Sequence, residues 1–252
     1  YKRQGLYDKK SKGMNMRLEF QHIFKSFSGT PILKDVTFQA QSGKAMGFLG
    51  RNGAGKTTTL RILSSVMEPS DGSATILGFD TKNQAENIRR LVGYMPQNFS
   101  LYPDLSVLEN LNFFADIQLV PREEKRDRIE EMLRFTHLEE FSNRRAGKLS
   151  GGMKKRVGVA RALVGHPEYI FYDEPTTGLD PVTSIQIDNL IQELTKKLKV
   201  TSLVITHDMF SVFKIAKSVV MLENGLAHFN GAPEEMQSST DPYILDFLQR
   251  YS

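Results

Sequence analysis

The sequence predicts an α/β fold with an inserted helical part, because short apolar runs alternate with segments whose apolar residues recur at helical spacing. The chain has 252 residues, enough for one large domain with its own core. Its apolar content of 40% and charged content of 25% are typical of a globular domain. No apolar stretch approaches the roughly 20 residues needed to cross a bilayer, so any role at a membrane must come through a partner.

The first elements are expected to form an antiparallel sheet at the edge of the core. β-rich runs at 17–24 and 36–40 are separated by turn residues at 28–29. A compact apolar run at 45–49 then leads through a glycine-rich turn into a helical pattern at 56–66. Strand, loop and helix in this order indicate the start of an α/β core.

The core continues through further apolar runs with helical patterns between several of them. The strand candidates lie at 74–77, 91–95, 169–172, 202–205 and 218–222. Mostly helical sequence at 104–165 interrupts them. Its helices are expected at 107–119, at 122–135 and from about Gly151. We expect this insertion, at about 98–165, to form a helical subdomain.

The two ends of the chain differ from the core. Residues 1–17 hold six basic side chains against one acidic one, a net charge of +5. Because the whole chain has a net charge of +4, the remaining residues are close to neutral and give no reason to expect a nucleic-acid groove. We interpret residues 1–15 as a flexible tail, either a disordered or non-native leader or a segment attracted to anionic lipid. Residues 16–238 are the expected main domain.

Residues 239–252 are expected to add a helical extension. An Asp-Pro pair opens a helix at 241–250, which places Ile244, Phe247 and Leu248 on one face. The chain has no cysteine, which excludes disulfides and cysteine-bound metals and agrees with a reducing compartment. No apolar signal core stands at the N-terminus, so a cytoplasmic location is expected.

A phosphate-binding loop follows the strand at 45–49. Residues 50–57 match the P-loop pattern of Gly, four residues, Gly-Lys-Ser/Thr, between a predicted strand and a predicted helix. The glycines let successive N–H groups converge on phosphate, and the helix N-terminus adds donors and partial positive charge. Lys56 is suited to bridge two phosphates and the Thr57 hydroxyl to bind Mg²⁺. The expected nucleotide-binding residues here are Gly50, Asn52, Gly53, Ala54, Gly55, Lys56, Thr57 and Thr58.

A second element narrows the chemistry, since a P-loop alone indicates only a nucleoside triphosphate. The apolar run at 169–172 ends in Asp173 and Glu174, at the end of a strand where a parallel sheet presents functional groups. Asp173 is suited to hold Mg²⁺ through its water shell, and Glu174 is placed to polarise an attacking water. The sequence therefore predicts hydrolysis of a nucleoside triphosphate with Mg²⁺.

The segment Leu-Ser-Gly-Gly-Met at 149–153 carries a family resemblance. It opens a predicted helix about twenty residues before the Asp-Glu pair, and over residues 16–238 the chain resembles ATP-binding cassette (ABC) ATPases, whose fold is a RecA-like P-loop core with an antiparallel β subdomain. The resemblance implies that Ser150, Gly151 and Gly152, here called the signature segment, bind the γ-phosphate of ATP held by a second copy. Two copies would then enclose two ATP molecules.

Four further positions fit the family pattern: Gln97, which senses metal and water; Asp180, at the dimer interface; His207, which contacts the γ-phosphate; and Phe27, which stacks on adenine. The resemblance thus implies catalytic roles for Lys56, Gln97, Glu174 and His207. It implies metal contacts for Thr57, Gln97 and Asp173. Met153 stands where the commonest signature has glutamine, and Phe27 where many relatives have tyrosine, but neither change removes a phosphate ligand.

Two kinds of transporter remain open. Residues 76–147 resemble ATPases of exporters for drugs, polysaccharides or lipids. From Ser150 onward the chain is more similar to ATPases of Mce/Mla-type lipid-trafficking systems, which we favour because the short C-terminal helix motif is the less common feature. The resemblance implies an integral membrane permease that docks in a groove near residues 97–104, and a place on the cytoplasmic face of the inner membrane. The C-terminal helix either closes the domain or contacts the second ATPase or an accessory protein.

Rival interpretations fit less well. ABC ATPases that act on ribosomes usually carry two cassettes, and those that act on DNA are split by long coiled coils, neither of which is present here. A regulatory module without turnover is disfavoured by the intact Asp173, Glu174 and His207.

Overall fold

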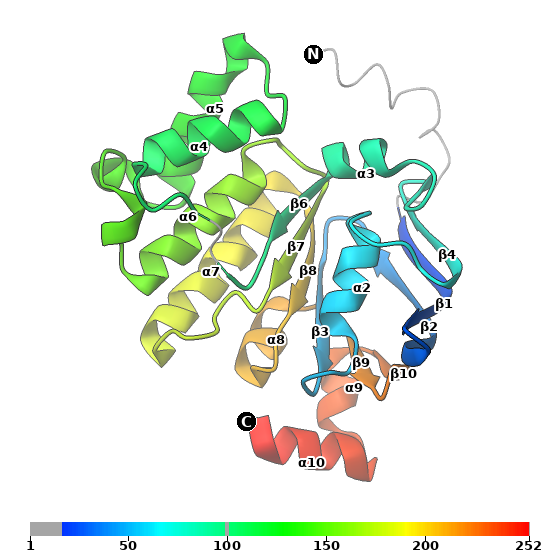
Figure 1. Ribbon diagram of the computed structural model, residues 1–252. Coiled ribbons are helices and arrows are strands. Elements are labelled where there is room, and N and C mark those ends of the chain that lie inside the picture. Colours follow the sequence, from blue (N-terminus) through cyan, green and yellow to red (C-terminus); the bar gives the residue numbers. More distant parts are fainter. Residues whose placement is uncertain (1–16, 99–100, 252) are drawn as a thin grey trace.

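The computed structural model describes residues 17–98 and 101–251. The predicted tail at 1–15 lies outside these residues. Two sheets form the core of the fold (Figure 1). The larger orders its strands β10-β9-β3-β8-β7-β6, with β10 antiparallel to β9 and all other neighbours parallel. Its strands are β3 (Ala45–Gly50), β6 (Val92–Met95), β7 (Tyr169–Asp173), β8 (Thr201–Ile205), β9 (Ser218–Glu223) and β10 (Leu226–Gly231).

The smaller sheet is antiparallel and orders its strands β2-β1-β4-β5. They are β1 (Arg17–Phe27), β2 (Thr30–Gln41), β4 (Asp71–Ile76) and β5 (Phe79–Asp80). This confirms the predicted antiparallel sheet. Its first hairpin is longer than predicted, because Ser28 and Gly29, with φ of 47° and 83°, form a tight turn whose twist allows both strands to pair up to it.

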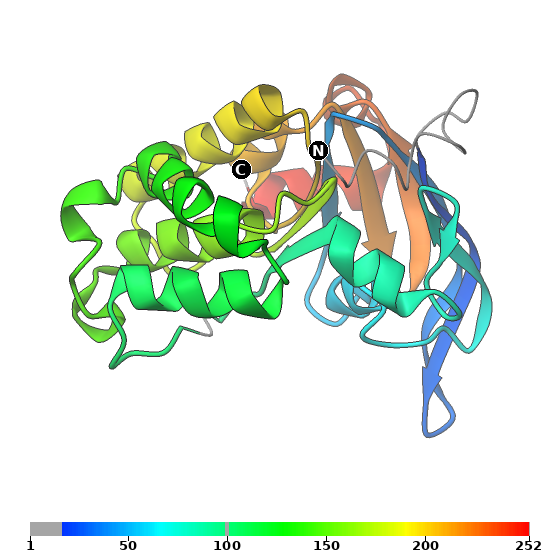
Figure 2. The same ribbon diagram turned by 90° about the horizontal axis from the view of Figure 1, so that it is seen from above.

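Helices cover both faces of the parallel sheet and extend to one side of it. They are α2 (Lys56–Leu63), α3 (Ala85–Leu91), α4 (Val107–Ile117), α5 (Arg122–Phe135), α6 (Gly151–Leu163), α7 (Pro181–Leu198), α8 (Met209–Ile215), α9 (Pro233–Gln237) and α10 (Pro242–Tyr251), with 3-10 turns at Glu139–Phe141 and Ala146–Lys148. Figure 2 shows α4, α5 and α6 gathered at the side of the molecule away from the antiparallel sheet. The helical sequence thus forms its own layer.

Two helices end earlier than the apolar pattern suggests. The helix predicted at 56–66 ends at Leu63, since Ser65 takes a φ of 54° and turns the chain. The helix predicted at 107–119 ends at Ile117, and Leu119 takes a φ of 55°. Left-handed residues of this kind close a helix, and apolar spacing alone does not reveal them.

Burial on both faces explains why β7 is a continuous apolar run. Ile170 and Tyr172 pack into the cluster formed with α6 and α7, whereas Tyr169 and Phe171 pack toward α2 and the antiparallel sheet. A third cluster joins α8, β9 and α10, and in it Phe247 is fully buried. The apolar face of α10 is therefore covered by its own domain.

Candidate nucleotide site

The candidate site lies where three neighbouring parallel strands end. The P-loop follows β3, His207 follows β8, and Asp173 with Glu174 ends β7. Carboxyl ends of adjacent parallel strands meet at one edge of a sheet, which is the usual place for ligands in such folds. Segments separated by more than a hundred residues are thus brought together.

The P-loop needs glycine at two positions for steric reasons. Gly50 has a φ of 145°, and a Cβ there would meet the carbonyl oxygen of Leu222. Gly55 has a φ of 104°, and its Cβ would meet the side chain of Leu33. Any side chain would therefore push the loop out of place as well as strain its backbone. The glycines set the loop from which α2 begins.

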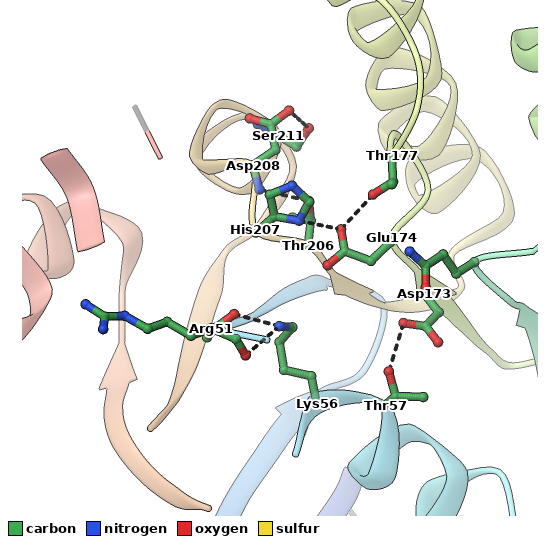
Figure 3. Close-up of polar contacts among 12 residues, drawn as sticks. Arg51, Lys56, Thr57, Asp173, Glu174, Thr177, Thr206, His207, Asp208 and Ser211 are labelled. Atoms are coloured by element: carbon green, nitrogen blue, oxygen red, sulfur yellow. Dashed lines mark hydrogen bonds and ion pairs between the residues drawn. The ribbon is translucent and has the colours of Figure 1, made fainter. Parts of the chain in front are cut away.

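Lys56 points back into this loop (Figure 3). Its Nζ donates to the carbonyl oxygens of Gly50, at 2.6 Å, and Arg51, at 3.1 Å. Burial lowers the pKa of Lys56, although the nearby Glu174 and Asp173 act in the opposite direction. The ammonium group is held at the loop, at the start of a helix, where it can reach a phosphate.

Asp173 and Thr57 face each other on the other side of the loop. The Thr57 hydroxyl lies 3.5 Å from Asp173 Oδ1, and Tyr94 donates its phenol proton to Asp173 Oδ2 at 3.0 Å. Burial, the largest effect, raises the pKa of Asp173, while the hydrogen bond from Tyr94 lowers it. A hydroxyl and a carboxylate oxygen are hard donors that suit Mg²⁺. Within the described ranges, no group of three or more His, Cys, Asp or Glu side chains is arranged to hold a metal ion by itself.

Glu174 is held by two side chains. His207 Nδ1 lies 3.0 Å from Glu174 Oε2, and the Thr177 hydroxyl donates to the same oxygen at 3.0 Å. Figure 3 shows His207 and Thr177 converging on the carboxylate from separate segments. Glu174 also has a φ of 51°, an uncommon conformation for a residue with a side chain and one that gathers at functional sites.

Lys56, Thr57 and Glu174 border one cavity of about 320 Å³. Phe27, 44% exposed, stands at its rim, where a flat ring could stack on a base. The residues that line the cavity are Phe27, Ile32, Asn52, Gly53, Gly55, Lys56, Thr57, Thr58, Gln97, Glu174 and Ile205. Seven of the predicted cofactor-binding residues, together with Gln97 and Glu174, therefore share one cavity. Gly50, Ala54 and Asp173 are not among the described residues that line it.

The signature segment and Asp180 are not among the described residues that line this cavity. Ser150 caps α6, its hydroxyl accepting from Met153 N at 3.3 Å. Asp180 caps α7, accepting from Thr183 N at 3.0 Å. A Cβ on Gly152 would lie 2.5 Å from Cγ2 of Thr183, so these two helix starts adjoin each other. They form a second group of predicted site residues, apart from the first.

Sequence reasoning missed two residues that support the site, the half-buried Tyr94 and the buried Lys155. Tyr94 binds Asp173, as described above. Lys155, on α6, is 1% exposed and donates to the carbonyl oxygens of Glu174, at 2.9 Å, and Gln97, at 3.3 Å. Burial lowers the pKa of Lys155. No motif marks these residues, but a lysine at a buried position of an amphipathic helix is itself a signal that it has polar partners.

A P-loop lysine, a metal-suited Thr–Asp pair and a glutamate held by histidine define the class: a P-loop nucleoside triphosphatase. Comparison with known proteins then gives the family. Residues 33–177 match the family described as "ABC transporter". The chain is 36% identical to the ABC transporter ATP-binding protein NatA of Bacillus subtilis (strain 168), over 86% of this chain and 88% of that protein. It belongs to the ABC transporter family, as an ATP-hydrolysing cassette that uses ATP and Mg²⁺.

Other relatives vary in length and cargo. The chain is 41% identical to the probable multidrug ABC transporter ATP-binding protein YbhF of Escherichia coli (strain K12), over 68% of this chain but only 30% of that protein. Among solved structures, the cassette MJ0796, a dimer bound to ADP and Pi, shares the fold with a TM-score of 0.77 at 29% identity, over 86% of this chain and 98% of that one. In the described ranges, no helix is long and apolar enough to cross a bilayer.

Proposed function

We propose that this cassette powers an Mce/Mla-type lipid transporter through a separate membrane subunit, from the cytoplasmic face of the inner membrane. The main support for ATP hydrolysis is the contact of His207 and Thr177 with Glu174 beside the P-loop. Glu174 would accept a proton from the attacking water. His207 would contact both this carboxylate and the γ-phosphate and so fix their relative position. Bound Mg²⁺ would neutralise phosphate charge between Thr57 and Asp173.

The separation of the signature segment from the cavity supports a head-to-tail dimer. Ser150 caps α6 by accepting from Met153 N, and the partial positive charge of a helix start favours an anion. A second copy would bring its own P-loop and bound ATP to this helix start. The dimeric MJ0796 cassette shows that a relative of this fold pairs. Closure on ATP and reopening after hydrolysis would then drive the membrane subunit.

An exposed apolar surface supports contact with that subunit. Tyr102 stacks edge-on against Phe113 of α4, with ring centroids 4.7 Å apart. Farther along α4, Ile117 is 58% exposed, and Leu119 beyond it is 67% exposed. These two residues line a hollow of about 250 Å³ with Arg89 and Arg90 of α3. We propose that this surface, extending the predicted groove near 97–104, receives a cytoplasmic helix of the permease. Residues 99 and 100 of that groove lie outside the described ranges.

The C-terminal helix offers less to a partner than its sequence suggests. Ile244 is 3% exposed and Phe247 is fully buried against the domain itself. An accessory protein would therefore have to contact the opposite face, where Leu245 is 41% exposed. The packing of α10 favours the interpretation that it closes its own domain.

The cargo is the part to test. The chain, purified from membranes with its integral subunit, would be reconstituted into vesicles carrying a fluorescent phospholipid, with the Glu174→Gln complex as control. ATP-dependent lipid movement by the wild type only is the expected result. Movement of a drug-like amphiphile instead would support the second candidate, an exporter, which the likeness to YbhF and to the Nod factor export ATP-binding protein I of Burkholderia thailandensis favours.

A further inference from the structure

A buried carboxyl group that belongs to no motif is linked through Ser211 to Asp208, the residue that follows His207. Asp188 is on α7, eight residues after Asp180, and is only 3% exposed. The hydroxyl oxygen of Ser211, on α8, lies 2.8 Å from Asp188 Oδ2 and 3.0 Å from Asp208 Oδ2. Three oxygen atoms from two helices thus stand in a row, with Ser211 in the middle.

The row contains two hydrogen bonds but only one hydroxyl proton. If both carboxyl groups were ionised, Ser211 could give its proton fully to one of them, and the other would face an oxygen lone pair. Two full hydrogen bonds require a second proton, which must reside on a carboxyl group. The spacing therefore indicates one neutral acid, one hydroxyl and one carboxylate.

The surroundings indicate which carboxyl group is neutral. Asp208 caps α8, accepting at Oδ1 from the backbone N–H groups of Phe210, at 2.9 Å, and Ser211, at 3.3 Å, and such donors favour its ionised form. Asp188 Oδ1 is buried and has no hydrogen-bond partner within the described part of the chain. A bare buried oxygen costs far less on a neutral acid than on a carboxylate. Asp188 is thus the group that holds the proton.

The row connects directly to the catalytic groups. Asp208 follows His207, whose ring contacts Glu174, and Figure 3 shows Ser211 and Asp208 stacked behind that histidine. At the other end, Asp188 belongs to the helix that begins at Asp180, the residue assigned to the dimer interface. These hydrogen bonds therefore connect the segment of His207 to α7, the helix that a second copy is proposed to touch.

We propose that Asp188 is a positioning residue for ATP hydrolysis. As a neutral acid it donates to Ser211, and Ser211 donates to Asp208. These two hydrogen bonds fix His207 relative to α7. The assignment rests on the proposed roles of Glu174 and His207 in hydrolysis. Deprotonation of Asp188 removes one of the two hydrogen bonds and places a second negative charge near Asp208. The link between α7 and the segment of His207 is then weaker.

The two hydrogen bonds of Ser211 with Asp188 and Asp208 consequently depend on pH. Burial, the largest effect, raises the pKa of Asp188 to about 6; the negative charge of Asp208 acts in the same direction, and Ser211 and Lys214 oppose it. Asp208, the N-cap of α8, and Lys214, on α8, are the charged groups in the described structure that affect this carboxyl. The chain of hydrogen bonds is complete below about pH 6 and loses a bond above it.

Steady-state ATP turnover by the full chain tests the proposal. Asp188→Ala and Ser211→Ala should lower kcat about tenfold with KM for ATP nearly unchanged, the effect of one lost hydrogen bond in this link. Asp188→Asn, whose amide donates without a proton from solvent, should match the wild type at pH 5.5 and exceed it about threefold at pH 8. Glu193→Gln, which removes an exposed carboxylate from the same helix, is the matched control and should show neither effect.

Thermal unfolding provides a readout independent of turnover. Folding raises the pKa of Asp188 above the ordinary value, so its proton stabilises the folded state in acid and that stabilisation is lost as pH rises through about 6. The Tm of Asp188→Asn relative to the wild type should therefore rise by about 3 °C between pH 5 and pH 8. An unchanged Tm difference, or a kcat ratio that is flat across pH 6, overturns the proposal. If His207→Ala keeps full turnover, the assigned role of His207 fails instead, while the Tm result stands.

Discussion

The two groups of predicted site residues contrast sharply. In the first, Lys56 and Glu174 border one cavity, and Glu174 already contacts His207. In the second, Ser150 and Asp180 serve their own helices as N-caps and lie apart from that cavity. The difference teaches that one chain brings its hydrolytic residues together by itself, whereas the helix start proposed to bind phosphate lies outside that cavity. The following predictions test this division.

The largest effect is expected from Glu174→Gln. The amide keeps the shape of the side chain but cannot accept the proton of water, so kcat should fall by about 100-fold or more. ATP binding should persist, because the phosphate donors are untouched, and a closed dimer should accumulate on a sizing column. Normal hydrolysis by this variant would refute the role given to the first group.

A mixture of two inactive variants tests the division itself. Lys56→Ala should lose ATP affinity, whereas Ser150→Ala should bind ATP in each chain but fail to turn it over. In a mixed dimer one of the two composite sites keeps both residues, so an equal mixture should recover about a quarter of the wild-type turnover. Lack of recovery, with dimers present by light scattering, would count against shared sites.

Lys155→Met should have a smaller effect within the first group. It removes the donor to the carbonyl oxygens of Glu174 and Gln97 and leaves buried acceptors unpaired, which costs about 1–3 kcal/mol. We expect kcat to fall about tenfold with the Kd for ATP nearly unchanged. Lys154→Met, the next position on α6, is the control. Equal losses in both variants would show a general effect on the helix.

Tyr94→Phe should have the smallest effect. It removes one hydrogen bond from Asp173 while leaving the ring in place, so the Mg²⁺ concentration for half-maximal turnover should rise about threefold. Tyr102→Phe, on the exposed surface beside α4, serves as the control and should not change it. A Mg²⁺ requirement unaltered by Tyr94→Phe would mean that this phenol does not tune the metal site.

The parts of the fold that depend on local pattern were predictable from the sequence. β3, β7 and β8 are continuous buried runs, and α5 has the predicted bounds, because a charged amphipathic pattern over 122–135 leaves little choice. β2 begins six residues earlier than predicted, since its first half is mostly exposed and lacks alternation. Its pairing with β1 is a tertiary effect that the pattern does not contain.

The site divides in the same way. Lys56, Asp173 and Glu174 follow strands and carry motifs, so their neighbourhood could be predicted. Tyr94 and Lys155 act through contacts between elements distant in sequence, and no spacing rule reveals such contacts. The roles of Ser150 and Asp180 depend on a second copy and stay predictions.

The order of strands in the parallel sheet has a consequence for how the protein is made. β8 lies between β3 and β7, yet it comes last of the three in the chain. A nascent chain that has not yet released Ile205 carries the P-loop and both carboxylates but lacks the strand that sets their separation. Such non-local pairing forms late. ATP is therefore expected to stabilise the domain only after β8 has joined the sheet, because the complete cavity also includes Ile205.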